Sequence, residues 1–320
     1  MYLHLRHRAP TRTDMTLSAH NPKVAGSNPA PATNRNGIEA PLLRRRLKAE
    51  NPRSRTAQPP KARRAKPVAI NDDQMRVRDA LLRFGTTLAG SSTSFTPDRE
   101  ADAFVRTDAF AFLVAVICDE QVKFEAAWNA PHELRRRLGH WDLVRIASEP
   151  ARTVRAFAEP SALHRWVTKT AERVVAAAVR VLDEYDGDAG AIWAGTPSAA
   201  EVRRRLTAFD GIGQKKSAMA VEILDRDLRI PLTDFAGSDI AVDIHVRRVF
   251  LRSGLADRDD VELMIEVARA LNPDRPGALD LPVWEIGRTH CHPSAPTCFS
   301  CPIESACPRL LARGAEVRGA

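Results

Sequence analysis

The sequence predicts an all-α protein, and three observations carry this prediction. Aromatic residues make up only 6% of the 320 residues. Ala, Leu, Val and Arg dominate instead, a mixture that favours helices over sheets. From residue 71 onward, apolar residues recur at steps of three and four, the period of an amphipathic helix. The sequence contains no turn dipeptide between two alternating strands and no internal repeat.

The expected helices follow one another along the chain. Residues 71–90 form the first, and a Gly/Ser loop follows at Gly90–Ser94. Residues 103–118 are almost entirely apolar, and the length of this run favours one buried central helix over a strand. The remaining helices are expected to begin at Pro131 and end before Gly139, to span 169–184, to follow a capping box at Ser198–Glu201, and to span 259–271 and 276–287.

The basic charge is concentrated in the first 66 residues. They hold 15 Lys and Arg against 3 Asp and Glu, a balance of +12, whereas the rest of the chain holds 33 against 37, a balance of −4. We expect residues 1–70 to be a disordered basic tail. The folded part must then bind any nucleic acid through local patches and backbone donors.

Two interpretations of this tail are open. The peptide Gly-Ser-Asn-Pro at residues 26–29 is what the T-arm of a transfer-RNA gene encodes in one reading frame. In the first interpretation, residues 1–66 are therefore translated from DNA upstream of the true start codon. The alternative is a genuine tail with non-specific DNA affinity. The first residues lack the apolar core of a secretory signal, and no apolar run could span a bilayer. We therefore expect a cytoplasmic protein whose cysteines are reduced.

A glycine turn between two helices lies at residues 206–220. Gly211-Ile-Gly213 follows one helix and precedes another. Glycine lets the backbone approach closely, and the first N–H groups of the second helix can hold a DNA phosphate without a basic side chain. The alternative is an ordinary turn between helices with a glycine cap.

Two residues beyond this turn could carry chemistry. Lys215 is either a solvated surface charge or, if it loses its proton, an amine nucleophile, and Lys216 beside it could lower its pKa. Asp243 precedes the helical run VRRVFLRSGL and would make a good N-cap. A carboxylate near a nucleophilic lysine could also accept its proton and stabilise positive charge on a sugar ring.

Four cysteines cluster near the C-terminal end of the sequence. Cys291, Cys298, Cys301 and Cys307 have the spacing C-x6-C-x2-C-x5-C. Four thiolates this close can hold one metal centre, and the spacing alone leaves zinc and iron–sulfur open. His290 and His292 are expected to lie near the centre without binding it, and Cys118 to be a core residue.

These signals together resemble the endonuclease III family of helix-hairpin-helix DNA glycosylases over about residues 75–310. The run FDGIGQKKSA resembles the family's LPGVGRKTA and would make Lys215 the Schiff-base lysine. AVDIHVRRV resembles AVDTHV and would make Asp243 the catalytic aspartate. AVICDEQVK resembles AVLLSAQAT and would make Gln121 the residue that fills the gap left by a flipped base. A looser match puts Trp166 in a loop that wedges the opposite strand.

The resemblance implies a two-lobed fold, with a six-helix lobe at 103–236 and a cluster lobe built from 71–102 and 237–320. It also implies a 4Fe–4S cluster on the four cysteines, with zinc as the weaker alternative. The implied activity is base-excision repair by a monomeric glycosylase with attached lyase activity, in the bacterial nucleoid. Its partner would be double-stranded DNA with damaged bases, oxidised pyrimidines first, or abasic sites.

The sequence also departs from the family pattern. The segment between Lys215 and Asp243 is about ten residues longer, around RDLRIPLTDFAGS. Asp210 replaces a proline, and Phe124 stands where the family has an acidic residue. The adenine-mispair branch is disfavoured, because Lys215 is present and Ile117 occupies that branch's glutamate position. A non-catalytic DNA-binding relative and a zinc-binding helical adaptor are the alternatives.

Overall fold

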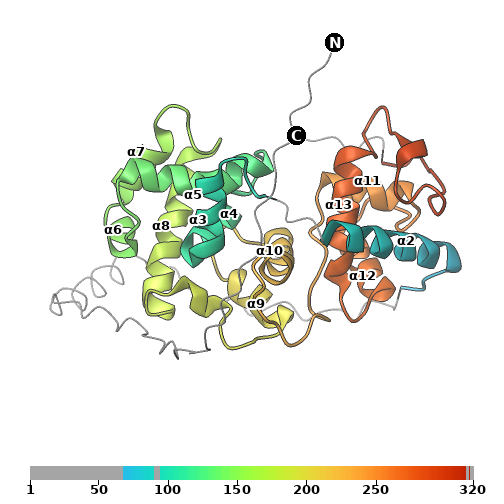
Figure 1. The fold of residues 1–320 in the computed structure, drawn as a ribbon, viewed down its shortest axis with the longest axis horizontal. Coiled ribbons are helices and arrows are strands. Elements are labelled where there is room, and N and C mark those ends of the chain that lie inside the picture. The colour runs from blue at the N-terminus through green and yellow to red at the C-terminus, as the bar shows by residue number, and fades with distance from the viewer. Residues whose placement is uncertain (1–67, 90–93, 315–316, 318–320) are drawn as a thin grey trace, which may run out of the picture. The chain divides into compact units, whose positions relative to one another are not determined.

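A computed structural model describes residues 68–89, 94–314 and 317 (Figure 1). These residues all belong to one of the two compact units of the chain, residues 60–320. The expected basic tail lies outside the described residues except for its last three positions, and so does most of the Gly90–Ser94 loop. Within the described part, helices are the regular structure and no strand occurs, which confirms the all-α prediction.

Most of the helices are joined by short connections. Their bounds are α2 (Asp72–Ala89), α3 (Arg99–Thr107), α4 (Ala109–Cys118), α5 (Phe124–Leu138), α6 (Leu143–Ser148), α7 (Pro150–Ala158), α8 (Val167–Glu184), η1 (Ala189–Ile192), α9 (Ala199–Leu206), α10 (Gln214–Arg226), α11 (Ile244–Arg252), α12 (Val261–Leu271), η2 (Pro276–Leu279), α13 (Asp280–Thr289) and η3 (Cys298–Ser300). A longer segment separates α10 from α11. No described helix is both long and apolar enough to cross a membrane.

Buried side chains form two hydrophobic clusters. The first contains side chains from α3 to α10, and α4 is its centre, since almost every side chain of that helix is fully buried. The second combines α2 with α11, α12 and α13. Figure 1 shows α2, in blue, beside α12 and α13, in orange, so segments far apart in sequence complete this second core. The domain boundaries expected above stay a prediction.

Local signals fixed several helix ends as expected. Ser198 Oγ accepts a hydrogen bond from the Glu201 backbone N–H at 3.2 Å and begins α9. Gly139 ends α5 in the left-handed region at φ 71°. Asp243 caps α11 by accepting from the N–H groups of His245 and Val246.

Three expected helices were wrong in their bounds. The segment expected as one helix over 276–287 is the 3-10 helix η2 followed by α13, which ends at Thr289. The apolar run 103–118 is divided between α3 and α4, because Asp108 adopts an extended backbone and its carboxylate caps α4 at the Ala111 N–H, 2.7 Å away. The helix expected to begin at Pro131 begins seven residues earlier, at Phe124. Trp128 is fully buried in that earlier part and its ring lies 4.5 Å from that of Phe95. Burial of this large ring outweighs the backbone hydrogen bond that Pro131 removes.

Candidate active site

The turn between α9 and α10 brings the backbone close to α8. Gly211 has φ +85°, a conformation that side chains with a Cβ rarely adopt. A Cβ there would lie 2.7 Å from Cδ of Arg173, so the arginine side chain would have to shift to accept one. Gly213 caps α10 without a side-chain hydrogen bond. The first turn of α10 therefore has backbone donors available to an anion.

Lys215 lies in that first turn and forms an ion pair. Its Nζ donates to Oδ2 of Asp119 at 3.1 Å, with 39% of the lysine side chain and 9% of the aspartate side chain exposed. Burial by itself lowers the pKa of Lys215, but the charges of Asp119, Asp243 and Asp280 together raise it above its ordinary value. Three carboxylates from α4, α11 and α13 thus act on one amine.

Two of these carboxylates differ in what they bind. Oδ1 of Asp243 is occupied by the cap of α11, while Oδ2 has no hydrogen bond to any described residue. Asp280 accepts from the Ala241 N–H at 2.6 Å. Burial, with help from the charges of Asp243 and Glu222, raises the pKa of Asp280 to about 7. Asp280 therefore holds its proton more readily than an exposed aspartate does.

Lys216, the neighbour of Lys215, points elsewhere. Only 6% of Lys216 is exposed, and its Nζ donates to the carbonyl oxygen of Ile117 at 2.8 Å, near the end of α4. It also lies 3.6 Å from Glu120, which pairs with Arg173. Burial lowers the pKa of Lys216. Its role here is to fasten α10 to α4.

Gln121 and Trp166 lie on two loops that a buried histidine joins. Gln121 is exposed and has φ 55°, and Trp166 is 44% exposed at the start of α8. His164 is 2% exposed and its Nε2 lies 3.0 Å from the Glu120 carbonyl oxygen. Its Nδ1 accepts from the Trp166 backbone N–H at 3.0 Å, so the network assigns the proton to Nε2. Burial lowers the pKa of this imidazole, which remains neutral.

The four cysteines line one small pocket together with Arg252 and Ile303. Burial, reinforced by the charges of the other three sulfurs, raises the pKa of Cys301 to about 11. Among the described residues, no three His, Cys, Asp or Glu side chains converge closely enough to hold a single metal ion.

Two buried arginines hold the first cysteine loop. Arg248 is 1% exposed and donates to the carbonyl oxygens of Cys291 and Gly287. Arg252 is 3% exposed and donates to the His292 carbonyl oxygen at 2.7 Å, with its Nη1 3.8 Å from Cys291 Sγ. Neither guanidinium forms an ion pair with a carboxylate in the described part of the chain. Negatively charged thiolates would supply the missing counter-charge.

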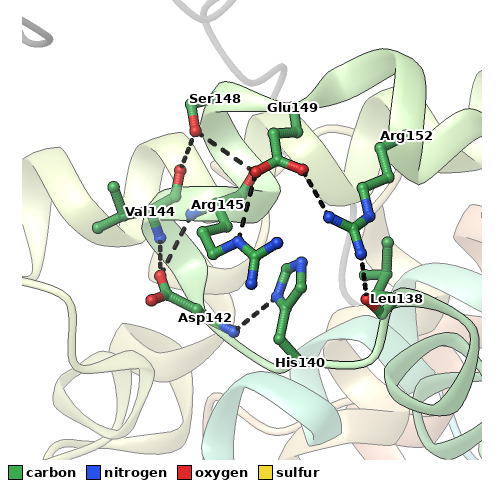
Figure 2. Close-up of polar contacts among 8 residues, drawn as sticks. All are labelled: Leu138, His140, Asp142, Val144, Arg145, Ser148, Glu149 and Arg152. Carbon is green, nitrogen blue, oxygen red and sulfur yellow. Dashed lines mark hydrogen bonds and ion pairs between the residues drawn. The ribbon is translucent and has the colours of Figure 1, made fainter.

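A wider cavity lies away from Lys215. It has a volume of about 630 Å³ and is lined by residues of α6 and α7 with Arg137. Figure 2 shows the contacts of two of its lining residues: Arg152 donates to Glu149 and to the Leu138 carbonyl oxygen, and Arg145, outside the lining, also donates to Glu149. Glu149 and Arg152 are therefore occupied by local structural contacts.

Sequence reasoning missed Asp119, His164 and Asp280. Asp280 is the first residue of α13, where an acidic residue is ordinary helix-dipole chemistry, so nothing distinguished it. Asp119 did carry a signal, because it stands directly before the Gln121 loop at the serine of AVLLSAQAT. His164 had none, since a single histidine in a loop has no pattern.

Comparison with known proteins supports the same fold. Models of known protein families and curated protein sequences give no match. Among solved structures, a trapped endonuclease III–DNA covalent intermediate with an estranged adenine is 18% identical, with a TM-score of 0.53, over 75% of this chain and 97% of that one. A non-covalent endonuclease III–DNA complex is 19% identical with a TM-score of 0.52. A thermostable thymine-DNA glycosylase is 15% identical with a TM-score of 0.51, and both matches cover 75% of this chain and 97% of the other.

The fold is therefore that of the helix-hairpin-helix DNA glycosylases. Within that class, the chain is similar over nearly the whole length of endonuclease III. At these identities the likeness establishes the fold alone, and the roles of individual residues are a separate matter.

Proposed function

We propose that this protein is a base-excision repair enzyme that binds double-stranded DNA and removes damaged bases. Oxidised pyrimidines are its first expected substrates, and abasic sites are the second. The observation that carries the proposal is the position of Lys215, directly after the glycine turn, where the charge of Asp243 acts on it. In a helix-hairpin-helix fold, an amine within the electrostatic influence of a carboxylate supports cleavage at a sugar carbon.

DNA binding would rest on the backbone rather than on net charge. Residues 67–320 have a balance of −4, so they lack the general attraction for phosphates of a basic domain. The free N–H groups at the start of α10, beyond Gly211 and Gly213, offer directional donors instead. Gln121 and Trp166 are exposed and would fill the space left by a flipped base and wedge the opposite strand.

The chemistry would proceed in two stages. The bond between the base and C1′ breaks, and Oδ2 of Asp243 stabilises the positive charge that develops on the sugar. Neutral Lys215 then bonds to C1′ and loses a proton, and the C1′–O4′ bond breaks, so that the sugar opens and a protonated Schiff base forms. Loss of a proton from C2′ and departure of the 3′ phosphate then nick the strand. Both stages require the damaged nucleotide to leave the duplex.

We infer that Cys291, Cys298, Cys301 and Cys307 hold a 4Fe–4S cluster. Each sulfur in such a cube binds a different iron, so the sulfurs stand farther apart than around one zinc ion. All four sulfurs line one pocket, as the ligands of a single centre must. When bound, the cluster fastens the loop between α13 and the end of the described chain. Iron and sulfide analysis with visible absorbance tests this, and one zinc per chain would contradict it.

A panel of lesion-containing duplexes with borohydride trapping tests the activity. Lys215→Ala is expected to abolish the trapped complex, whereas continued trapping would move the nucleophile elsewhere, with Lys216 tested next. Asp243→Asn is expected to lower turnover by about 10²-fold or more while DNA binding persists. Full activity would make Asp243 only a helix cap. Failure of the wild-type protein on every lesion and on abasic DNA would favour a non-catalytic DNA-binding protein.

A further inference from the structure

We propose that Asp119 is a positioning residue that holds Lys215 as an ammonium ion, so that base removal proceeds while Schiff-base formation and nicking are suppressed at neutral pH. This inference rests on the proposed function and sharpens it. Base removal then uses water: the C1′–N bond breaks, a C1′–O bond forms, the water proton passes to Asp243 and the base leaves with the bonding electrons.

The ion pair is held in place from the Asp119 side. Asp119 is the residue at the end of α4, a helix whose side chains are almost all fully buried. Its backbone N–H bonds to the Val116 carbonyl oxygen, and the next N–H bonds to that of Cys118. With only 8% of the residue exposed, the carboxylate has little room to turn toward water. The 3.1 Å contact with Lys215 Nζ is therefore built into the fold.

The charges around Lys215 favour its protonated form. Burial opposes this form, but the charge of Asp119, in direct contact with the amine, and the charges of Asp243 and Asp280 outweigh it. Lys216, the nearest cation in sequence, is directed to Ile117 and Glu120. Because the pKa of Lys215 lies above its ordinary value, only a very small fraction of this amine is neutral near pH 7.5. Only that fraction can attack a carbon.

The carboxylate is a specific departure from the pattern that the chain otherwise resembles. The matching motif AVLLSAQAT has serine where this chain has Asp119, and a neutral hydroxyl does not stabilise an ammonium ion as a carboxylate does. The opposite role, in which Asp119 accepts the proton and activates Lys215, requires an amine that gives up its proton readily. The raised pKa of Lys215 argues against that role.

The full-length protein and its Asp119→Asn and Asp119→Ser variants test the proposal. Trapping on abasic DNA and base release from lesion DNA are measured separately between pH 6 and 10. The wild-type trapping rate should rise about tenfold per pH unit across this range. At pH 7.5 both variants should trap at least about tenfold faster, with their pH profiles displaced to lower pH, since one unit of pKa is a tenfold change in neutral amine. Base release should change far less.

Asp259→Asn is the matched control. Asp259 accepts hydrogen bonds from Arg247 in a partly exposed ion pair. The substitution therefore makes the same chemical change in another part of the chain. Its trapping profile should overlie that of the wild type. If trapping falls in both Asp119 variants while they remain folded, Asp119 is a proton acceptor and the proposal is overturned.

A direct titration of Lys215 separates failure of this proposal from failure of the proposed function. Reductive ¹³C-methylation labels lysine amines for NMR, and Lys215→Arg identifies the Lys215 signal by its absence. The midpoint should lie above that of exposed lysines in the wild type and fall by about one unit or more in Asp119→Asn. An unchanged midpoint refutes the proposal. If the Lys215 titration midpoint falls in Asp119→Asn but the wild-type protein removes no base, the ion-pair role of Asp119 stands and the repair activity is rejected.

Discussion

Replacing Asp239 by alanine is expected to lower the free energy of unfolding by about 3 kcal/mol. Asp239 is 1% exposed and lies in the long segment between Lys215 and Asp243. Its two oxygens accept from Nε and Nη2 of Arg269 on α12, at 2.8 and 2.7 Å, and from Nη1 of Arg203 on α9. The carboxylate therefore links two helices to the segment that leads to the site.

The magnitude follows from what the substitution leaves behind. Removing one partner of a buried ion pair costs about 3–5 kcal/mol, because the other charge loses its compensation. Arg269 is 53% exposed and can be rehydrated, whereas Arg203 is only 16% exposed, so the lower end of that range applies. For a domain of this size the melting temperature should fall by about 6–12 °C.

Urea denaturation followed by circular dichroism measures this loss, with Asp259→Asn as the control. That substitution removes a partly exposed pair with Arg247 and should cost less than about 1 kcal/mol. A loss under about 1 kcal/mol for Asp239→Ala would refute the reasoning. It would mean that other contacts of the segment, such as the Gly277 N–H bond to Ser238 Oγ, hold it in place.

Three further predictions concern the turn, the buried histidine and the cysteine loop. Gly211→Ala should lower the free energy of unfolding by about 1–2 kcal/mol and weaken DNA binding in a filter assay, because Gly211 has φ +85° and lies close to Arg173. Gly213→Ala should be tolerated, because the space around Gly213 is open. The pKa of His164 is lowered in the folded protein, so the unfolded chain takes up its proton first, and stability in urea should be full above about pH 6.5 and fall below it. His164→Gln should flatten that slope, and an unchanged slope would contradict the assignment. The proposed cluster predicts bound iron and a brown absorbance in the wild type and the loss of both in Cys307→Ser, while retention of both in the variant would exclude the cluster from this loop.

Features with a local cause were predictable from the sequence. The caps at Ser198 and Asp243 and the helix end at Gly139 depend on hydrogen bonds within a few residues, so the pattern alone indicated them. Helix bounds that depend on tertiary packing were not predictable. The segment 124–130 became helical because Trp128 is buried against Phe95, a contact between residues far apart in sequence.

The sequence by itself determined the helical class, the glycine turn with Lys215 and the spacing of the four cysteines, because periodicity, backbone freedom and ligand spacing are properties of short segments. Only the tertiary structure decided which charged groups surround Lys215. Asp119 lies 96 residues away along the chain, and Asp280 begins another helix. Electrostatic interactions act through space rather than along the chain, so the protonation of that amine is set by packing that no local pattern encodes.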